Sequence, residues 1–104
     1  MTTTARLLLL LGRYKESVEK DRQAIEGDPE SRDAHYELAK GLDYEGDFKN
    51  SAIEGERALT LPELGTSDTL IHFLLARIYV KLKQPDLAKA HIEKFLAAPQ
   101  TSTR

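Results

Sequence analysis

Apolar and small residues recur at helical spacing along the chain, and no segment alternates as a β-strand does. Between residues 32 and 44, Ala34, Leu38 and Leu42 would share one face of a helix. Gly46 then suits a left-handed stop, and Asp47 can cap the helix that follows. The same pattern predicts helices over about 14–27, 32–44, 48–60, 68–82 and 86–97. The sequence therefore predicts an all-α protein.

The chain also repeats itself. Gly12-Arg13-Tyr14-Lys15-Glu16-Ser17 returns thirty-four residues later as Gly46-Asp47-Phe48-Lys49-Asn50-Ser51. A third copy is offset by thirty-seven residues, so that Leu38-Ala39 returns as Leu75-Ala76. The extra residues fall within 61–68 and lengthen that turn. Self-similarity at a period of this length indicates helical hairpins stacked into an array.

The three copies resemble the tetratricopeptide repeat, whose pattern runs from an aromatic residue through Leu-Gly/Ala and Tyr to Ala, an aromatic, Ala and Pro. The third copy has His72, Leu75-Ala76, Tyr79, Ala88, Ile92, Phe95 and Pro99 at these places; the middle copy has His35, Leu38-Ala39, Leu42, Gly46-Asp47-Phe48, Ser51, Ala58 and Pro62; the first has Ala5, Leu8, Gly12-Arg13-Tyr14, Ser17, Ala24 and Asp28-Pro29. The resemblance implies a right-handed α-solenoid of three helix-turn-helix hairpins with six helices. It would cover residues 1–99, in repeats of about 1–31, 32–65 and 66–99, with a disordered tail at 100–104.

Several residues depart from this pattern. His35 and His72 stand at the aromatic position, and their recurrence is explained by packing there. In the second helices Asp21 and Gly55 replace a large apolar residue. A glycine in mid-helix costs about 0.8–1 kcal/mol relative to alanine, so we expect looser contacts around the middle repeat. Ala39 and its equivalent in the third copy are expected where the two helices of one repeat cross closely.

The resemblance implies that the first helices line a concave groove that holds a peptide or a partner helix. The groove positions carried over are Arg6, Leu9, Asp33, Tyr36, Lys40, Asp43, Leu70, Phe73, Arg77 and Val80. Arg6, Lys40 and Arg77 are equivalent, and would form a basic column suited to acidic side chains; the alternative is solvated surface charge. The apolar groove residues would supply an anchor site, or else pack on the preceding repeat or on the turn at 61–68.

The two ends of the array allow other functions. Ile92, Phe95 and Leu96 at one end, and the run 7–11 at the other, could mediate self-assembly into a homo-oligomeric scaffold. A further alternative is an accessory domain of a larger multidomain protein. The leucine run 7–11 is too short for a secretory signal and passes directly into the repeat, so we interpret it as part of a repeat helix.

Composition narrows the function further. The net charge is −2 and basic residues do not cluster, which argues against nucleic acid as a partner. The chain has no cysteine, which fits a reducing compartment such as the cytoplasm. No run is long enough to span a membrane, and the three histidines lack metal-binding spacing. We therefore expect no cofactor, no metal and no enzymatic activity, and a protein or peptide as the partner.

Overall fold

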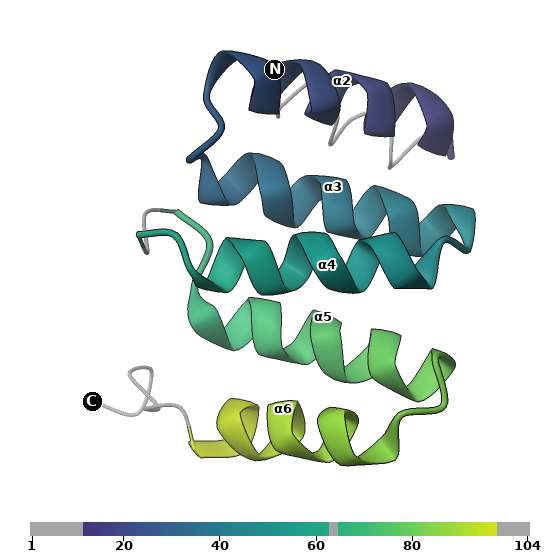
Figure 1. Ribbon diagram of the computed structural model, residues 1–104, viewed down its shortest axis with the longest axis vertical. Coiled ribbons are helices and arrows are strands. Elements are labelled where there is room, and N and C mark those ends of the chain that lie inside the picture. The colour runs from purple at the N-terminus through teal and green to yellow at the C-terminus, as the bar shows by residue number, and fades with distance from the viewer. Residues whose placement is uncertain (1–11, 63–64, 98–104) are drawn as a thin grey trace.

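The described part of the protein is a stack of α-helices. The computed structural model describes residues 12–62 and 65–97. These contain α2 (Tyr14–Gly27), α3 (Arg32–Glu45), α4 (Phe48–Leu59), α5 (Asp68–Lys81) and α6 (Pro85–Ala97), and no strand. The helices follow one another down the stack in chain order (Figure 1). The all-α prediction is confirmed, while the helix expected before Gly12 and the tail at 100–104 lie outside the described residues.

The helix ends agree with the sequence prediction to within one residue, because the expected capping residues act as caps. Gly46 ends α3 in the left-handed conformation, with φ of 87°. Asp47 begins α4, and its carboxylate accepts a hydrogen bond from the backbone N–H of Asn50. Ser31 and Ser67 cap α3 and α5 in the same way. Each cap satisfies a backbone donor that the first turn of a helix leaves without a partner.

The core lies where the hairpins meet. Its main cluster joins α3, α4, α5 and α6 through Ala39, Ala52, Ala58, Ile71, Leu74, Leu75, Ile78, Tyr79 and Ala88. A smaller cluster of Val18, Leu38 and Leu42 joins α2 to α3. Ala39 is fully buried, and the hydroxyl of Ser51 donates to its carbonyl oxygen over 2.5 Å. This short contact between α3 and α4 confirms the close crossing expected at that alanine.

Gly55 is a site of close contact, so the expectation of looser packing around the middle repeat is wrong. The glycine is buried, and a Cβ atom built on it would lie 2.7 Å from Cδ2 of Leu75. The missing side chain therefore makes room for a leucine of α5 against the backbone of α4. The cost of a glycine in mid-helix is offset here by burial of a fully enclosed side chain.

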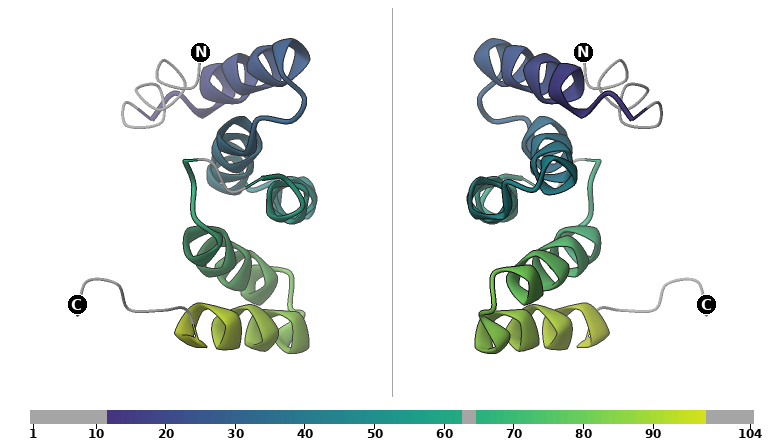
Figure 2. Two further views of the ribbon diagram at one scale, coloured as in Figure 1. Left: turned by 90° about the vertical axis from the view of Figure 1, so that its left-hand side faces the viewer. Right: turned by 90° about the vertical axis from the view of Figure 1, so that its right-hand side faces the viewer.

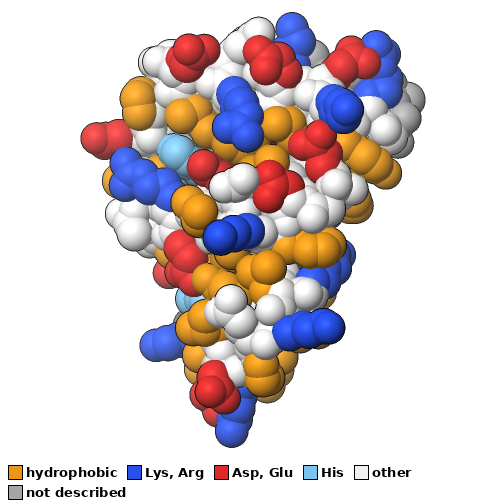
Figure 3. Space-filling model, turned by 45° about the vertical axis from the view of Figure 1, so that its right-hand side comes forward, with side chains coloured by type: hydrophobic (Ala, Val, Ile, Leu, Met, Phe, Trp, Pro, Cys, Tyr) orange, Lys and Arg blue, Asp and Glu red, His pale blue; other side chains and the backbone are white. Residues whose placement is uncertain are grey.

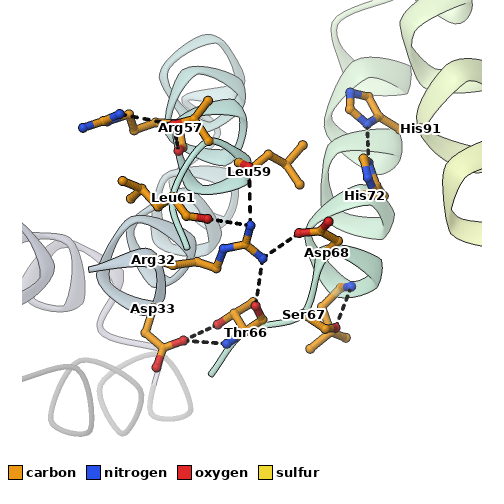
Figure 4. Close-up of polar contacts among 12 residues, drawn as sticks. Arg32, Asp33, Arg57, Leu59, Leu61, Thr66, Ser67, Asp68, His72 and His91 are labelled. Carbon is orange, nitrogen blue, oxygen red and sulfur yellow. Dashed lines mark hydrogen bonds and ion pairs between the residues drawn. The ribbon is translucent and has the colours of Figure 1, made fainter. Parts of the chain in front are cut away.

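Two neighbouring residues at the start of α3 hold the long loop between α4 and α5 (Figure 4). The buried guanidinium of Arg32 donates to the carbonyl oxygens of Leu61 and Thr66 over 2.9 and 3.0 Å, and to the carboxylate of Asp68 over 2.7 Å. Asp33 accepts hydrogen bonds from both the backbone N–H and the hydroxyl of Thr66. The lengthened turn is thus fixed to the preceding hairpin, which sets where α5 begins.

The helices alternate between two sides of the stack. In the side views of Figure 2, α3 and α5 lie towards one side and α4 lies towards the other. Contacts run directly from α3 to α5 as well as between successive helices. Within residues 12–62 and 65–97, no helix is long and apolar enough to cross a membrane.

Candidate partner-binding groove

The structure has a hollow between α3 and α5, where the resemblance placed the groove. A pocket of about 190 Å³ is lined there by Tyr36, Lys40, Asp43, Tyr44, Leu70, Phe73, Leu74 and Arg77. A second pocket of about 410 Å³ adjoins it at the beginnings of the two helices, and shares Tyr36, Lys40 and Leu70 with it. Seven of the proposed groove residues therefore line these two adjoining pockets. Val80 lies further along α5 and is exposed, and Arg6 and Leu9 fall outside the described residues.

The apolar part of the groove lies on α5. Leu70 and Phe73 are each 49% exposed, one turn apart on the same face of the helix. The ring of Phe73 packs against that of Phe95 in α6, with centroids 5.4 Å apart. Phe95, which the sequence grouped with the end of the array, therefore also contacts the groove helix. These side chains leave apolar surface open to solvent beside the pocket.

Charged groups in the groove are layered by depth. The carboxylates of Glu37 and Asp43 are each 2% exposed and lie at the floor. Lys81 donates to Asp43 over 2.7 Å, Arg77 lies 3.6 Å from it, and Lys40 lies 3.8 Å from Glu37. The basic groups are the more exposed partners, so an incoming carboxylate meets cations before it meets anions. Sequence reasoning missed Lys81, although it lies one turn beyond Arg77 on the same helix.

The outer face of α6 is largely exposed, unlike the equivalent face of α4. Pro85, Lys89, Ile92 and Leu96 are the repeat equivalents of Phe48, Ala52, Gly55 and Leu59, which pack into the core around α5. In α6 only Ala88 is buried, and Ile92 and Leu96 are 43% and 69% exposed. A lysine therefore replaces a buried alanine in the middle of this face. The long side chain of Lys89 keeps part of the face polar.

The three histidines take part in polar contacts that the sequence did not reveal. His35 is buried between the carboxylate of Glu54, 2.7 Å from Nδ1, and the carbonyl oxygen of Pro29, 2.8 Å from Nε2. His72 instead faces His91 on α6. The repeat offset of thirty-seven residues relates Glu54 to His91, which is the signal that could have identified the pairs. No group of residues within the described ranges could hold a metal ion.

The surface charge is mixed. On the face in Figure 3, acidic and basic side chains alternate among apolar ones and form no basic tract. A nucleic-acid interface would need basic side chains clustered on one face. The mixed charge on this face therefore does not match a nucleic-acid interface.

Comparison with known proteins agrees with the geometry of the last hairpin. Residues 70–101 match the tetratricopeptide repeat family model, and no curated protein matches the chain significantly. Tetratricopeptide repeats are non-catalytic helical hairpins that generally serve as protein–protein interaction modules. Residues 70–101 are thus similar to a tetratricopeptide repeat, and α3 and α4 form a helical hairpin before them.

Proposed function

We propose that the groove between α3 and α5 binds an extended or helical segment of a partner protein. The observation that supports this most directly is the half-exposed pair Leu70 and Phe73 beside the basic groups Lys40 and Arg77. Exposed apolar surface bordered by polar groups is typical of protein interaction sites. The match of residues 70–101 to a family of interaction modules supports the same function.

The groove suggests which partner residues it would select. A large apolar side chain would pack between Tyr36, Leu70 and Phe73, with Val80 extending the contact along α5. A carboxylate on the partner would approach the basic rim, where the guanidinium of Arg77 can bind it through two hydrogen bonds. Because the rim cations already face buried carboxylates, we expect the apolar anchor to supply most of the affinity.

The groove would be longer in the three-repeat arrangement predicted for residues 1–99. In that arrangement Arg6 and Leu9 would extend the basic column and the apolar contact by one repeat. The resulting partner would be an acidic segment with one apolar anchor. No enzymatic role is part of this proposal.

A peptide-display selection tests the proposal without a known partner. The wild-type protein would be used to enrich random peptides, which are then measured for binding to Phe73→Ala and Arg77→Glu. We expect the enriched peptides to carry a large apolar residue and carboxylates. They should bind each variant roughly five- to thirtyfold more weakly, because a buried apolar or charged contact is worth about 1–2 kcal/mol.

Matched controls come from the other side of the stack. Ile53→Ser and Arg57→Glu change an exposed apolar and an exposed basic residue of α4. These variants should bind the enriched peptides as the wild type does. Equal binding to the groove variants and the wild type would overturn the proposal, as would peptides without acidic or large apolar residues.

The exposed Ile92 and Leu96 support a second candidate function, self-assembly through the end of the stack. Light scattering after size exclusion would measure the mass in solution over a wide range of protein concentration. A mass that rises with concentration, and that falls to the monomer in Ile92→Glu, would favour this function. A constant monomer mass would exclude it and leave the groove as the candidate site.

A further inference from the structure

A chain of hydrogen bonds links α5, α6 and α4 away from the groove. Nδ1 of His72 on α5 lies 2.8 Å from Nδ1 of His91 on α6. Figure 4 marks this contact between the two rings. Nε2 of His91 lies 3.1 Å from the carboxylate of Glu56 on α4. The hydroxyl of Tyr79 donates to the same carboxylate oxygen over 2.7 Å. Two imidazoles thus face each other across the interface of the last hairpin.

The acceptors fix the direction of this chain. A carboxylate only accepts hydrogen bonds, so His91 donates to Glu56 from Nε2. A neutral His91 then has an unprotonated Nδ1, which can only accept. His72 must therefore donate from its own Nδ1. In the neutral state each of the three contacts joins a donor to an acceptor, and α6 is held to both α4 and α5.

The arrangement tolerates one additional proton but not two. One proton can be added at Nε2 of His72 without breaking the chain. A second proton at Nδ1 of His91 would place two N–H groups against each other over 2.8 Å. Burial lowers the pKa of His72, and the charge of His91 lowers it further, as does Lys94 of α6. Asp68 of α5 and Glu56 of α4 act in the opposite direction, with smaller effect than burial.

We propose that the contact between His72 and His91 is an acid-sensitive latch that holds α6 against α5. When both rings are charged, the contact opens and α6 loses part of its attachment. Phe95 on α6 packs against Phe73, so the opening also reaches a residue that lines the groove. The latch does not depend on the proposed binding function. The equivalent His35 meets two acceptors, and full protonation of its ring breaks no contact.

Amide hydrogen exchange of the full chain tests the latch by resolving α6 from the other helices. Protection factors, which correct for the pH dependence of exchange chemistry, would be measured at pH 7.5 and 5.0. We expect protection in α6 to fall on the order of tenfold at the lower pH, because two charged rings no longer hold this helix, while α3 changes less. The ring signals of His72, followed by NMR, should show a pKa below the ordinary value of a histidine, because of burial and the neighbouring His91.

The variant His91→Gln separates the latch from general acid effects. A glutamine carbonyl can accept from His72 while its amide donates to Glu56, so the neutral contacts are kept and the second charge is removed. We expect its α6 protection to be the same at both pH values. If this variant does not fold, His72→Gln serves the same purpose. His35→Gln is the matched control and should leave the pH response of α6 unchanged. Equal α6 protection in the wild type at both pH values, or an undiminished acid response in the glutamine variants, would overturn the proposal.

Discussion

The hairpins α3–α4 and α5–α6 use equivalent positions for different purposes. At the aromatic position His35 meets a carboxylate, whereas His72 meets a second imidazole. In the second helix Gly55 receives a leucine from the next hairpin, whereas Ile92 is open to solvent. Within the described residues, α4 packs between α3 and α5, whereas one face of α6 is open to solvent. The comparison shows that place in the stack, and not the repeat pattern alone, decides what a residue does.

Leu75→Ala should have the largest effect, because Leu75 joins the two hairpins. Its side chain is fully buried and packs on the backbone at Gly55. Removing it leaves a cavity, and we expect the free energy of unfolding to fall by about 2–5 kcal/mol. Chemical denaturation would measure this change. Leu96→Ala on α6 is the control and should change stability by less than about 0.5 kcal/mol. Similar losses of stability for both variants would mean that Leu96 on α6 is packed as tightly as Leu75, which would contradict the comparison.

Substitutions at the equivalent positions Gly55 and Ile92 would test the same contrast between α4 and α6 directly. Gly55→Ile brings the residue of α6 into α4 and forces Leu75 to move. Overpacking of this kind should cost about 1–3 kcal/mol, despite the better helix propensity of isoleucine. Ile92→Ala in α6 should stay within about 0.5 kcal/mol of the wild type, as solvent-exposed substitutions do. A stable Gly55→Ile protein would show that α5 does not need this close approach.

Acid stability should distinguish the two histidine positions. The pKa of His72 is lowered in the folded state from 6.5, first by burial, so the unfolded chain takes up a proton more readily. This contribution to stability is present above about pH 6.5 and is lost as the pH falls towards the lowered pKa. Glu54→His would give His35 the same kind of partner, and should add an acid-induced loss of roughly 1 kcal/mol in urea titrations between pH 7.5 and 5.0. Glu54→Gln, which adds no charge, is the control. Parallel pH profiles for these two variants would contradict the comparison.

Lys89→Leu should have the smallest effect on folding. The side chain is exposed, so the free energy of unfolding should change by less than about 0.5 kcal/mol. The substitution would join Pro85, Ile92 and Leu96 into a continuous apolar face, and such faces promote association. We expect a larger mass in solution at high concentration than for Lys89→Gln. An unchanged monomer mass would show that the end face is not adhesive even without its lysine.

The sequence predicts local structure here far better than it predicts partners. Helix ends follow from capping residues such as Gly46 and Asp47, which act on their own chain neighbours. The groove positions follow from the repeat, which places Tyr36, Leu70 and Phe73 on facing helices. The ion pair of Lys81 with Asp43 joins residues distant in sequence, and spacing gives little sign of it. The contact of His91 with His72 was also missed, although the repeat offset relates it to the pair Glu54 and His35. The expectation for Gly55 was wrong because the space left by its missing side chain is filled by Leu75 of α5, which is twenty residues away in the sequence.

The long loop between α4 and α5 has a mechanical consequence. Arg32 and Asp33 belong to one hairpin, yet they grip the segment from which the next hairpin departs. The connection between the two hairpins is therefore held in place by residues of the first hairpin, α3–α4. A substitution of Arg32, which lines neither groove pocket, should therefore change how α5 is set against α3 without altering a residue that lines the groove.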